Sequence, residues 1–131
     1  TIAPKNPVNA YLPSIPKTLL TWPAVQPIVF RETLSAQNLW TAPNGDKLVD
    51  FGQNIAGVVR FTVRGERGRE VAYDCAEVLD AQGNFYRENY RSARAEVRYV
   101  LSGGGAETFT PDFTYMGFRY IRLKNWPEGA K

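Results

Sequence analysis

The 131-residue sequence predicts an all-β domain, an antiparallel β-sandwich. Apolar and polar residues alternate over several short segments, which is the period of a half-buried strand. Turn sequences rich in glycine, asparagine and proline separate these segments at intervals of about ten residues. No segment carries the apolar spacing of an amphipathic helix over about a dozen residues. About six to eight short strands packed as two sheets account for this pattern.

Residues 1–26 are expected to form a linker or the tail of a preceding domain. Prolines recur through them and remove the backbone donors that a regular ladder needs. Several large apolar side chains indicate that part of this segment packs against protein: Tyr11, Leu19, Leu20 and Trp22. The β-sandwich is expected over residues 27–131.

The expected strands follow one another from residue 27 to residue 123. They are "PIVFRETL" (27–34), "KLVDFG" (47–52), "GVVRFTVRG" (57–65), "REVAYDCAEVL" (69–79), "EVRYVLS" (96–102), "ETFTP" (107–111) and "FRYIRL" (118–123). Turns are expected at "PNGD" (43–46), "GERG" (65–68) and "DAQGN" (80–84), where glycine, asparagine and proline suit tight turns. Residues 85–94 are ambiguous between a loop and one helical turn.

The segment 57–65 shows the alternation most clearly. Val59, Phe61 and Val63 fall on one face, and the polar residues between them fall on the other. Because a four-residue glycine turn links it to residues 69–79, these two segments are expected to form a hairpin.

Composition excludes several functions. The net charge is +3, but acidic and basic side chains are interspersed between Arg60 and Arg98, as on a solvated surface and unlike a phosphate-binding stripe. We therefore expect no nucleic-acid partner. Apolar runs are far shorter than the roughly 18 residues of a membrane span, and no signal peptide is visible. No membrane partner is expected, and cytoplasmic and exported locations both stay open.

The cysteine and histidine content narrows the chemistry further. Cys75 is the only cysteine and histidine is absent, so an intrachain disulfide, the usual Cys/His zinc sites and the Ser-His-Asp triad are excluded. Cys75 lies in an alternating run and is predicted to be a buried strand thiol.

A pair of carboxylates flanking a sugar bond would make a glycosidase. The candidates are Asp50, Asp74, Glu77, Asp80 and Glu88. Alternation predicts that Asp74 faces solvent and that Glu77 points inward to an arginine, whereas Asp80 opens a turn, where Asp is common. The turn "DAQGN" has alternate oxygen ligands, but Arg91 stands where a calcium loop needs an acid. Neither a catalytic residue nor a metal or other cofactor is expected.

The stretch "FTPDFTYMGFRYIRLKNW" (109–126) is rich in aromatic residues. Tyr115, Arg119 and Tyr120 are candidate sugar contacts, since rings and an arginine donor can orient a pyranose. The alternative is a core strand. Arg119 shares its parity with Ile121 and Leu123, so both faces of this strand are predicted to be covered.

Three stretches together resemble one known family. "VDFGQNIAGVVRFTVRGERGREV" (49–71), "AEVLDAQGNFYRENYRSA" (76–93) and "FTYMGFRYIRL" (113–123) are similar to the concanavalin-like β-sandwich domain of bacterial α-L-rhamnosidases of glycoside hydrolase family seventy-eight. The resemblance covers residues 27–126. Val58 stands where the family commonly has tryptophan, and Met116 where it has histidine.

The resemblance implies a jelly-roll-like, non-catalytic domain that precedes an α/α-barrel. Such enzymes remove terminal α-L-rhamnose with inversion, and their acid and base lie in the barrel, so no catalytic residue is carried over to this chain. The implied partner is that barrel, and the implied substrate of the parent is a rhamnose-containing glycoside. The alternative function is a carbohydrate-binding module for rhamnosides or pectic glycans.

Overall fold

The computed structural model describes residue 14 and residues 21–127, and the chain divides into two units, Thr1–Glu32 and Thr33–Lys131. Residues 21–37 contain no strand, and Trp22, Ile28 and Phe30 are exposed. The prediction of a strand over residues 27–34 is therefore wrong. Its residues have no partner strand, and alternation alone does not hold an unpaired strand in water. The packing expected of Tyr11, Leu19 and Leu20 lies outside the described residues.

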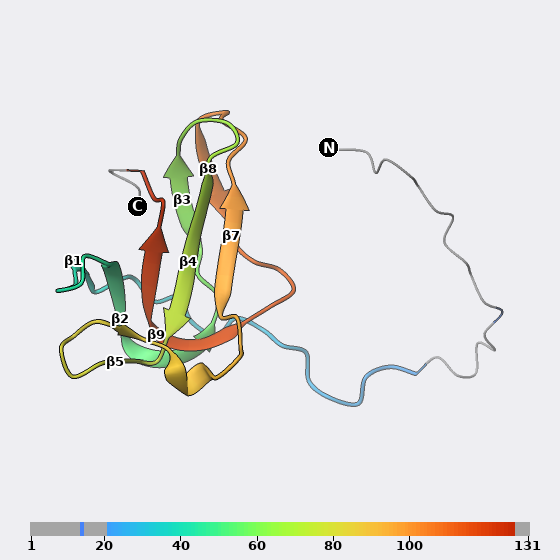
Figure 1. The fold of residues 1–131 in the computed structure, drawn as a ribbon. Helices are drawn as coiled ribbons and strands as arrows, with labels where there is room; N and C mark the ends of the chain where they lie inside the picture. Colours follow the sequence, from blue (N-terminus) through green and yellow to red (C-terminus); the bar gives the residue numbers. More distant parts are fainter. Residues whose placement is uncertain (1–13, 15–20, 128–131) are drawn as a thin grey trace. The chain divides into compact units, whose positions relative to one another are not determined.

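Within residues 33–127 the fold is almost entirely β, as expected (Figure 1). The strands are β1 (Asn38–Thr41), β2 (Lys47–Gly57), β3 (Phe61–Arg64), β4 (Glu70–Ala76), β5 (Val78–Leu79), β6 (Phe85–Tyr86), β7 (Glu96–Val100), β8 (Ala106–Phe109) and β9 (Met116–Lys124). One 3-10 turn, η2 (Glu88–Tyr90), follows β6. The turn and the short strand β6 resolve the ambiguity over residues 85–94.

The strands form one five-stranded sheet and two small ribbons, all antiparallel. The main sheet has the order β1-β2-β9-β4-β7, and the ribbons are β3-β8 and β5-β6. The last strand, β9, lies between β2 and β4. The three expected turns are present at residues 43–46, 65–68 and 80–84.

The hairpin expected between residues 57–65 and 69–79 does not form. The turn at residues 65–68 carries the chain from the β3-β8 ribbon into the main sheet instead. Both edges of β4 are occupied, one by β7 and the other by β9. A strand has only two hydrogen-bonding edges, so no edge of β4 is left for β3.

The core lies between the β3-β8 ribbon and the inner face of the main sheet. Val59, Phe61 and Val63 are buried, as the alternation predicts, and the polar residues between them are exposed. They pack with five main-sheet residues of the same core cluster and with Leu101, which follows β7: the five are Val71, Tyr73, Cys75, Phe118 and Ile121. The Phe61 ring lies 4.8–6.2 Å from four other aromatic rings, those of Tyr73, Tyr99, Phe109 and Trp126. This is the apolar interior of a sandwich.

The outer face of the main sheet is also covered, and there the prediction for Asp74 is wrong. Asp74 is completely buried. Its Oδ2 lies 2.7 Å from Arg122 Nη2 and 2.9 Å from Lys124 Nζ on β9, and its Oδ1 lies 3.3 Å from Arg87 Nη1. Arg122 in turn stacks 4.7 Å from the centre of the Phe85 ring on β6. Alternation correctly separates Asp74 from the core, but the β5-β6 ribbon and the residues after it close over this face.

The Asp74 carboxylate is the shared anion of three cations. A buried carboxylate is costly unless charged partners surround it, and removal of that carboxylate would leave the cations without compensation. One further carboxylate reaches each of two of these cations: Glu96 of β7 lies 2.7 Å from Lys124, and Asp46, the residue before β2, lies 3.2 Å from Arg122. The network therefore ties β2, β4, β7 and β9 together on the outer face.

Asp74→Asn should lower the free energy of unfolding by about 3 kcal/mol, because it removes the buried charge that three cations share. Urea denaturation followed by circular dichroism measures this value. Glu70→Gln is the matched control, since the Glu70–Arg98 pair is largely exposed and should contribute less than about 1 kcal/mol. Equal losses in the two variants would contradict a special role for Asp74.

Candidate functional site

The three candidate sugar contacts do not come together in the structure. Arg119 and Tyr120 lie on β9 beside Asp50 of β2. Tyr115 lies in the preceding connection, is 64% exposed and does not line the groove beside Tyr120. This groove, and not Tyr115, is the candidate site.

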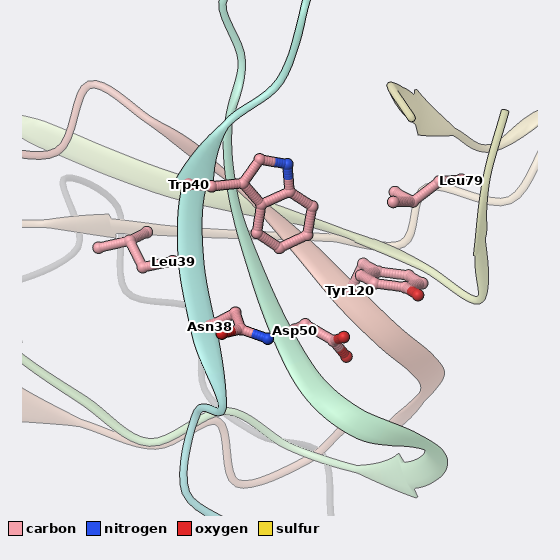
Figure 2. A pocket seen from close by; sticks show the side chains of 6 residues that line it. All are labelled: Asn38, Leu39, Trp40, Asp50, Leu79 and Tyr120. Atoms are coloured by element: carbon pink, nitrogen blue, oxygen red, sulfur yellow. The ribbon is translucent and has the colours of Figure 1, made fainter. Parts of the chain in front are cut away.

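The Trp40–Tyr120 groove is a shallow depression of about 340 Å³ on the β1-β2-β9 side of the sheet. Its lining is Asn38, Leu39, Trp40, Asp50, Leu79 and Tyr120. Figure 2 shows the indole of Trp40 next to the ring of Tyr120, with Leu79 beyond them. The two rings meet edge to face, with centres 6.2 Å apart and planes at 82°. The groove thus has two contacting rings in its lining and polar side chains at one end.

The strand register explains why these residues meet. Asn38 of β1 pairs with Asp50 of β2, and Asp50 pairs with Tyr120 of β9, so three neighbouring strands present one row of side chains. The ladder between β2 and β9 then shifts between Asp50 and Ile55. Gly52 lies in this bulge at φ 83°, a conformation that suits glycine, and its N–H donates to Asp50 Oδ1 at 2.7 Å.

Next to this bulge, the common face expected for Arg119 and Ile121 is wrong. Phe118 and Ile121 are both buried in the core although their parities differ, so regular alternation fails between them. Arg119 does not join Ile121 in the core. Its side chain is 38% exposed and turns to Asp50.

Asp50 and Arg119 form a bidentate ion pair. Arg119 Nε donates to Asp50 Oδ1 and Arg119 Nη2 donates to Asp50 Oδ2, each at 2.9 Å. The hydrogen bonds from Arg119 hold the pKa of Asp50 below its usual value, against the opposing effect of burial. The Arg119 guanidinium also lies 5.0 Å from the centre of the Tyr120 ring, a cation–π contact. Asp50 is therefore ionised and internally neutralised.

The remaining acid–base candidates are held by local structure. Glu77 accepts hydrogen bonds from the amides of Asn54 at 3.4 Å and Asn89 at 3.1 Å, so its expected arginine partner is replaced by two amides. This carboxylate sits close to Gly117, where an added Cβ would lie 3.4 Å from Glu77 Oε1. The Tyr90 hydroxyl donates to the Gly117 carbonyl. Glu77 thus helps to join β2, η2 and β9.

Asp80 caps its own turn, as its position predicts. Its Oδ1 accepts the N–H groups of Gln82 and Asn84, and its Oδ2 accepts the Asn84 amide. These bonds lower the pKa of Asp80, with the Asn84 backbone N–H as the largest cause. Glu88 lies in the first turn of η2. In residue 14 and residues 21–127, no cluster of three or more His, Cys, Asp or Glu side chains could hold a metal ion.

Cys75 is a buried thiol, as expected, with 1% of its surface exposed. Burial raises the pKa of Cys75 to about 12, which keeps it protonated and unreactive. No helix within the described ranges is long and apolar enough to cross a membrane.

Of the three candidate sugar contacts only Tyr120 lines the groove, and sequence reasoning did not single out Trp40, Asn38 or Leu79. Trp40 belongs to β1, which no period-two run marks, and Leu79 belongs to a two-residue strand. Their meeting depends on the order of strands in the sheet, which is a tertiary property.

Residues 40–131 match the family model described as the bacterial alpha-L-rhamnosidase concanavalin-like domain. The chain belongs to this family. An α-L-rhamnosidase of Streptomyces avermitilis is 40% identical over 101 residues, which are 77% of this chain and 10% of that protein. One from an Alteromonas species is 31% identical over 115 residues, or 88% of this chain and 12% of that protein. The chain thus spans about a tenth of the length of these relatives.

Solved structures of α-L-rhamnosidases contain a domain with the same fold as this chain. The crystal structure of the Streptomyces avermitilis α-L-rhamnosidase complexed with L-rhamnose gives a TM-score of 0.69 at 41% identity and covers 72% of this chain and 9% of that chain. The crystal structure of the native α-L-rhamnosidase from Aspergillus terreus gives a TM-score of 0.68 at 34% identity. This match covers 71% of this chain and 11% of that chain. The resemblance inferred from the three sequence stretches is confirmed.

Stability should depend on pH through Asp50. The pKa of Asp50 is lower in the folded chain than the usual 3.8, so its ionised form stabilises the fold above that value. The stabilisation is lost as the pH falls through the folded pKa. We expect the difference in unfolding free energy between the unaltered chain and Asp50→Asn to be full at about pH 6 and to shrink below about pH 4. Urea titrations at several pH values measure it.

The control for this prediction is Asp112→Asn, which changes an exposed carboxylate in the connection before β9. It should leave the unfolding free energy unchanged at each pH. A difference for Asp50→Asn that stays constant down to about pH 3 would contradict the assignment, because the linkage requires it to fall with the ionised fraction.

Proposed function

We propose that this chain is a non-catalytic domain of an α-L-rhamnosidase and braces the catalytic α/α-barrel that follows it. The parent would be a glycosidase that removes terminal α-L-rhamnose with inversion. Residues 1–26 would connect the sandwich of residues 27–131 to a preceding domain. The small share of each relative that the chain spans supports this proposal, because most of such a protein lies outside the domain.

The state of the carboxylates carries the non-catalytic part of the proposal. A glycosidase needs a carboxylic acid whose pKa is raised so that it can protonate the leaving group. Four carboxyl groups in the described part of the chain have a clearly altered pKa, and all four are lowered: Asp50, Asp80, Glu96 and Glu107. Hydrogen-bond donors cause each shift. These groups suit structural roles.

Exposed aromatic side chains support the bracing role. Phe113 is fully exposed and Tyr115 is 64% exposed, and both lie in the connection between β8 and β9. Contiguous exposed apolar surface is a feature of interaction sites, and these two side chains contribute such surface on one short loop. Within the proposed parent, the barrel is the occupant that would cover this loop.

The 131-residue chain should release no 4-nitrophenol from 4-nitrophenyl α-L-rhamnopyranoside above the blank, whereas the parent enzyme should release it. Absorbance at equal molar protein compares them. The control uses Glu77→Gln and Asp80→Asn in the parent, which should keep turnover because neither carboxylate takes part in the reaction. Turnover by the isolated chain that either variant abolishes would overturn the proposal.

Phe113→Ser combined with Tyr115→Ser should lower the thermal midpoint of the parent by several degrees, because the barrel contact loses two buried rings. The same double variant should leave the midpoint of the 131-residue chain unchanged, since both side chains are exposed there. Scanning calorimetry measures both. The replacement Val100→Ser, at another exposed apolar position on the edge strand β7, is the control. Equal effects on chain and parent would contradict a loop–barrel contact.

A further inference from the structure

We propose that the Trp40–Tyr120 groove binds one neutral pyranose ring, the terminal α-L-rhamnosyl group of a glycan. The identity of the sugar rests on the proposed function, whereas the preference for a neutral ring rests on the groove itself. The strands β1, β2 and β9 supply the two aromatic rings and the polar end of this site.

The apolar walls suit the C–H faces of a sugar. The Trp40 and Tyr120 rings are half-buried, and their edge-to-face contact fixes both at an angle of 82°. Leu79 adds an aliphatic contact beyond them. Aromatic rings carry a large apolar surface and, in Tyr and Trp, a polar edge that can reach a hydroxyl. A 6-deoxy sugar has a methyl group that matches such walls.

The polar end suits hydroxyl groups and disfavours charge. The Asp50 carboxylate lines the groove and is paired in a bidentate geometry with Arg119, which is not part of the lining, so Asp50 presents an acceptor whose charge is compensated. An anion would compete with Asp50 for the guanidinium, and a cation would compete with Arg119 for the carboxylate. Sugar hydroxyls can donate to Asp50 without breaking the pair. Figure 2 shows the amide nitrogen of Asn38 directed toward Asp50, which places a further donor there.

The site is built before any ligand arrives. The Gly52 N–H and Arg119 together hold the Asp50 carboxylate, and Arg119 is itself stacked on Tyr120. Side chains that are already ordered lose little conformational entropy on binding. The groove volume of about 340 Å³ lies near the lower end of the usual range for ligand sites, so it fits one ring. Because the depression is shallow, the rest of a glycan can extend into solvent.

Titration of the 131-residue chain with methyl α-L-rhamnopyranoside tests this site. We expect saturable binding with a Kd on the order of millimolar. In ¹H–¹⁵N spectra the Trp40 indole signal should shift with the titration, and the Trp22 and Trp126 indoles should not. Trp126 Nε1 donates to the Ala72 carbonyl in the interior, so its signal also reports that each variant is folded.

Variants assign the binding to the groove. Trp40→Ala and Tyr120→Ala should each weaken binding about tenfold or more, since each removes one wall. Asn38 is exposed at the rim of the groove, so Asn38→Ala should leave the fold intact and should weaken rhamnoside binding. The matched controls are Trp22→Ala and Tyr115→Ala, which remove exposed aromatic rings that do not line the groove. Both should bind as the unaltered chain does.

Three results would overturn the proposal. The first is a titration that does not saturate at rhamnoside concentrations about tenfold above a millimolar Kd. The second is tighter binding of the charged methyl α-D-galacturonoside than of the rhamnoside. The third is loss of binding in Tyr115→Ala while Trp40→Ala and Tyr120→Ala still bind. The proposed function fails separately, through the 4-nitrophenyl rhamnoside assay on the parent. A parent that hydrolyses this substrate while the chain binds no rhamnoside would overturn only the groove. A chain that binds the rhamnoside within a parent that does not hydrolyse it would overturn only the enzyme assignment.

Discussion

The buried carboxylate of Asp74 is the interaction on which the outer half of this fold depends. It holds Arg122 and Lys124 of β9 and Arg87 beside η2, and two other carboxylates extend the network to β2 and β7. The inner face of the same sheet is closed by ordinary apolar packing. The sheet is therefore covered on one side by a core and on the other by charge pairing, which requires defined partners and so fixes where the β5-β6 ribbon lies.

The Trp40–Tyr120 groove lies where the strict ladder gives way. The β2-β9 register shifts beyond Asp50, and the released backbone N–H of Gly52 turns back to that carboxylate. One irregularity thus orients Asp50, pairs it with Arg119 and leaves Tyr120 half-buried. Bulges re-aim side chains in this way at many functional sites. The carboxylates of Asp74 and Asp50 both pair with β9 but have different consequences, because Asp74 is sealed from solvent whereas Asp50 borders an open depression.

Much of the secondary structure could be predicted from the sequence, because period-two alternation and glycine turns are local signals. The segment 57–65 shows this, with Val59, Phe61 and Val63 buried as expected. Strand pairing could not be predicted. The turn at residues 65–68 looks like a hairpin turn, and only the competition of β7 and β9 for the edges of β4 shows that it is not. Asp74, Arg119 and Trp40 depend on the same tertiary information, so the sequence indicated only part of the candidate site.

The position of β9 has a consequence for how the domain is made. This strand is the last one in the described residues, yet it is central in the sheet and pairs with both β2 and β4. During synthesis on the ribosome, the earlier strands emerge with their inner edges unpaired and stay exposed until residues 116–124 are released. Both pairings of β9 are therefore long-range in sequence, a topology that folds slowly and leaves nascent edges open to aggregation. Attachment to further domains would lengthen synthesis without shortening this vulnerable interval.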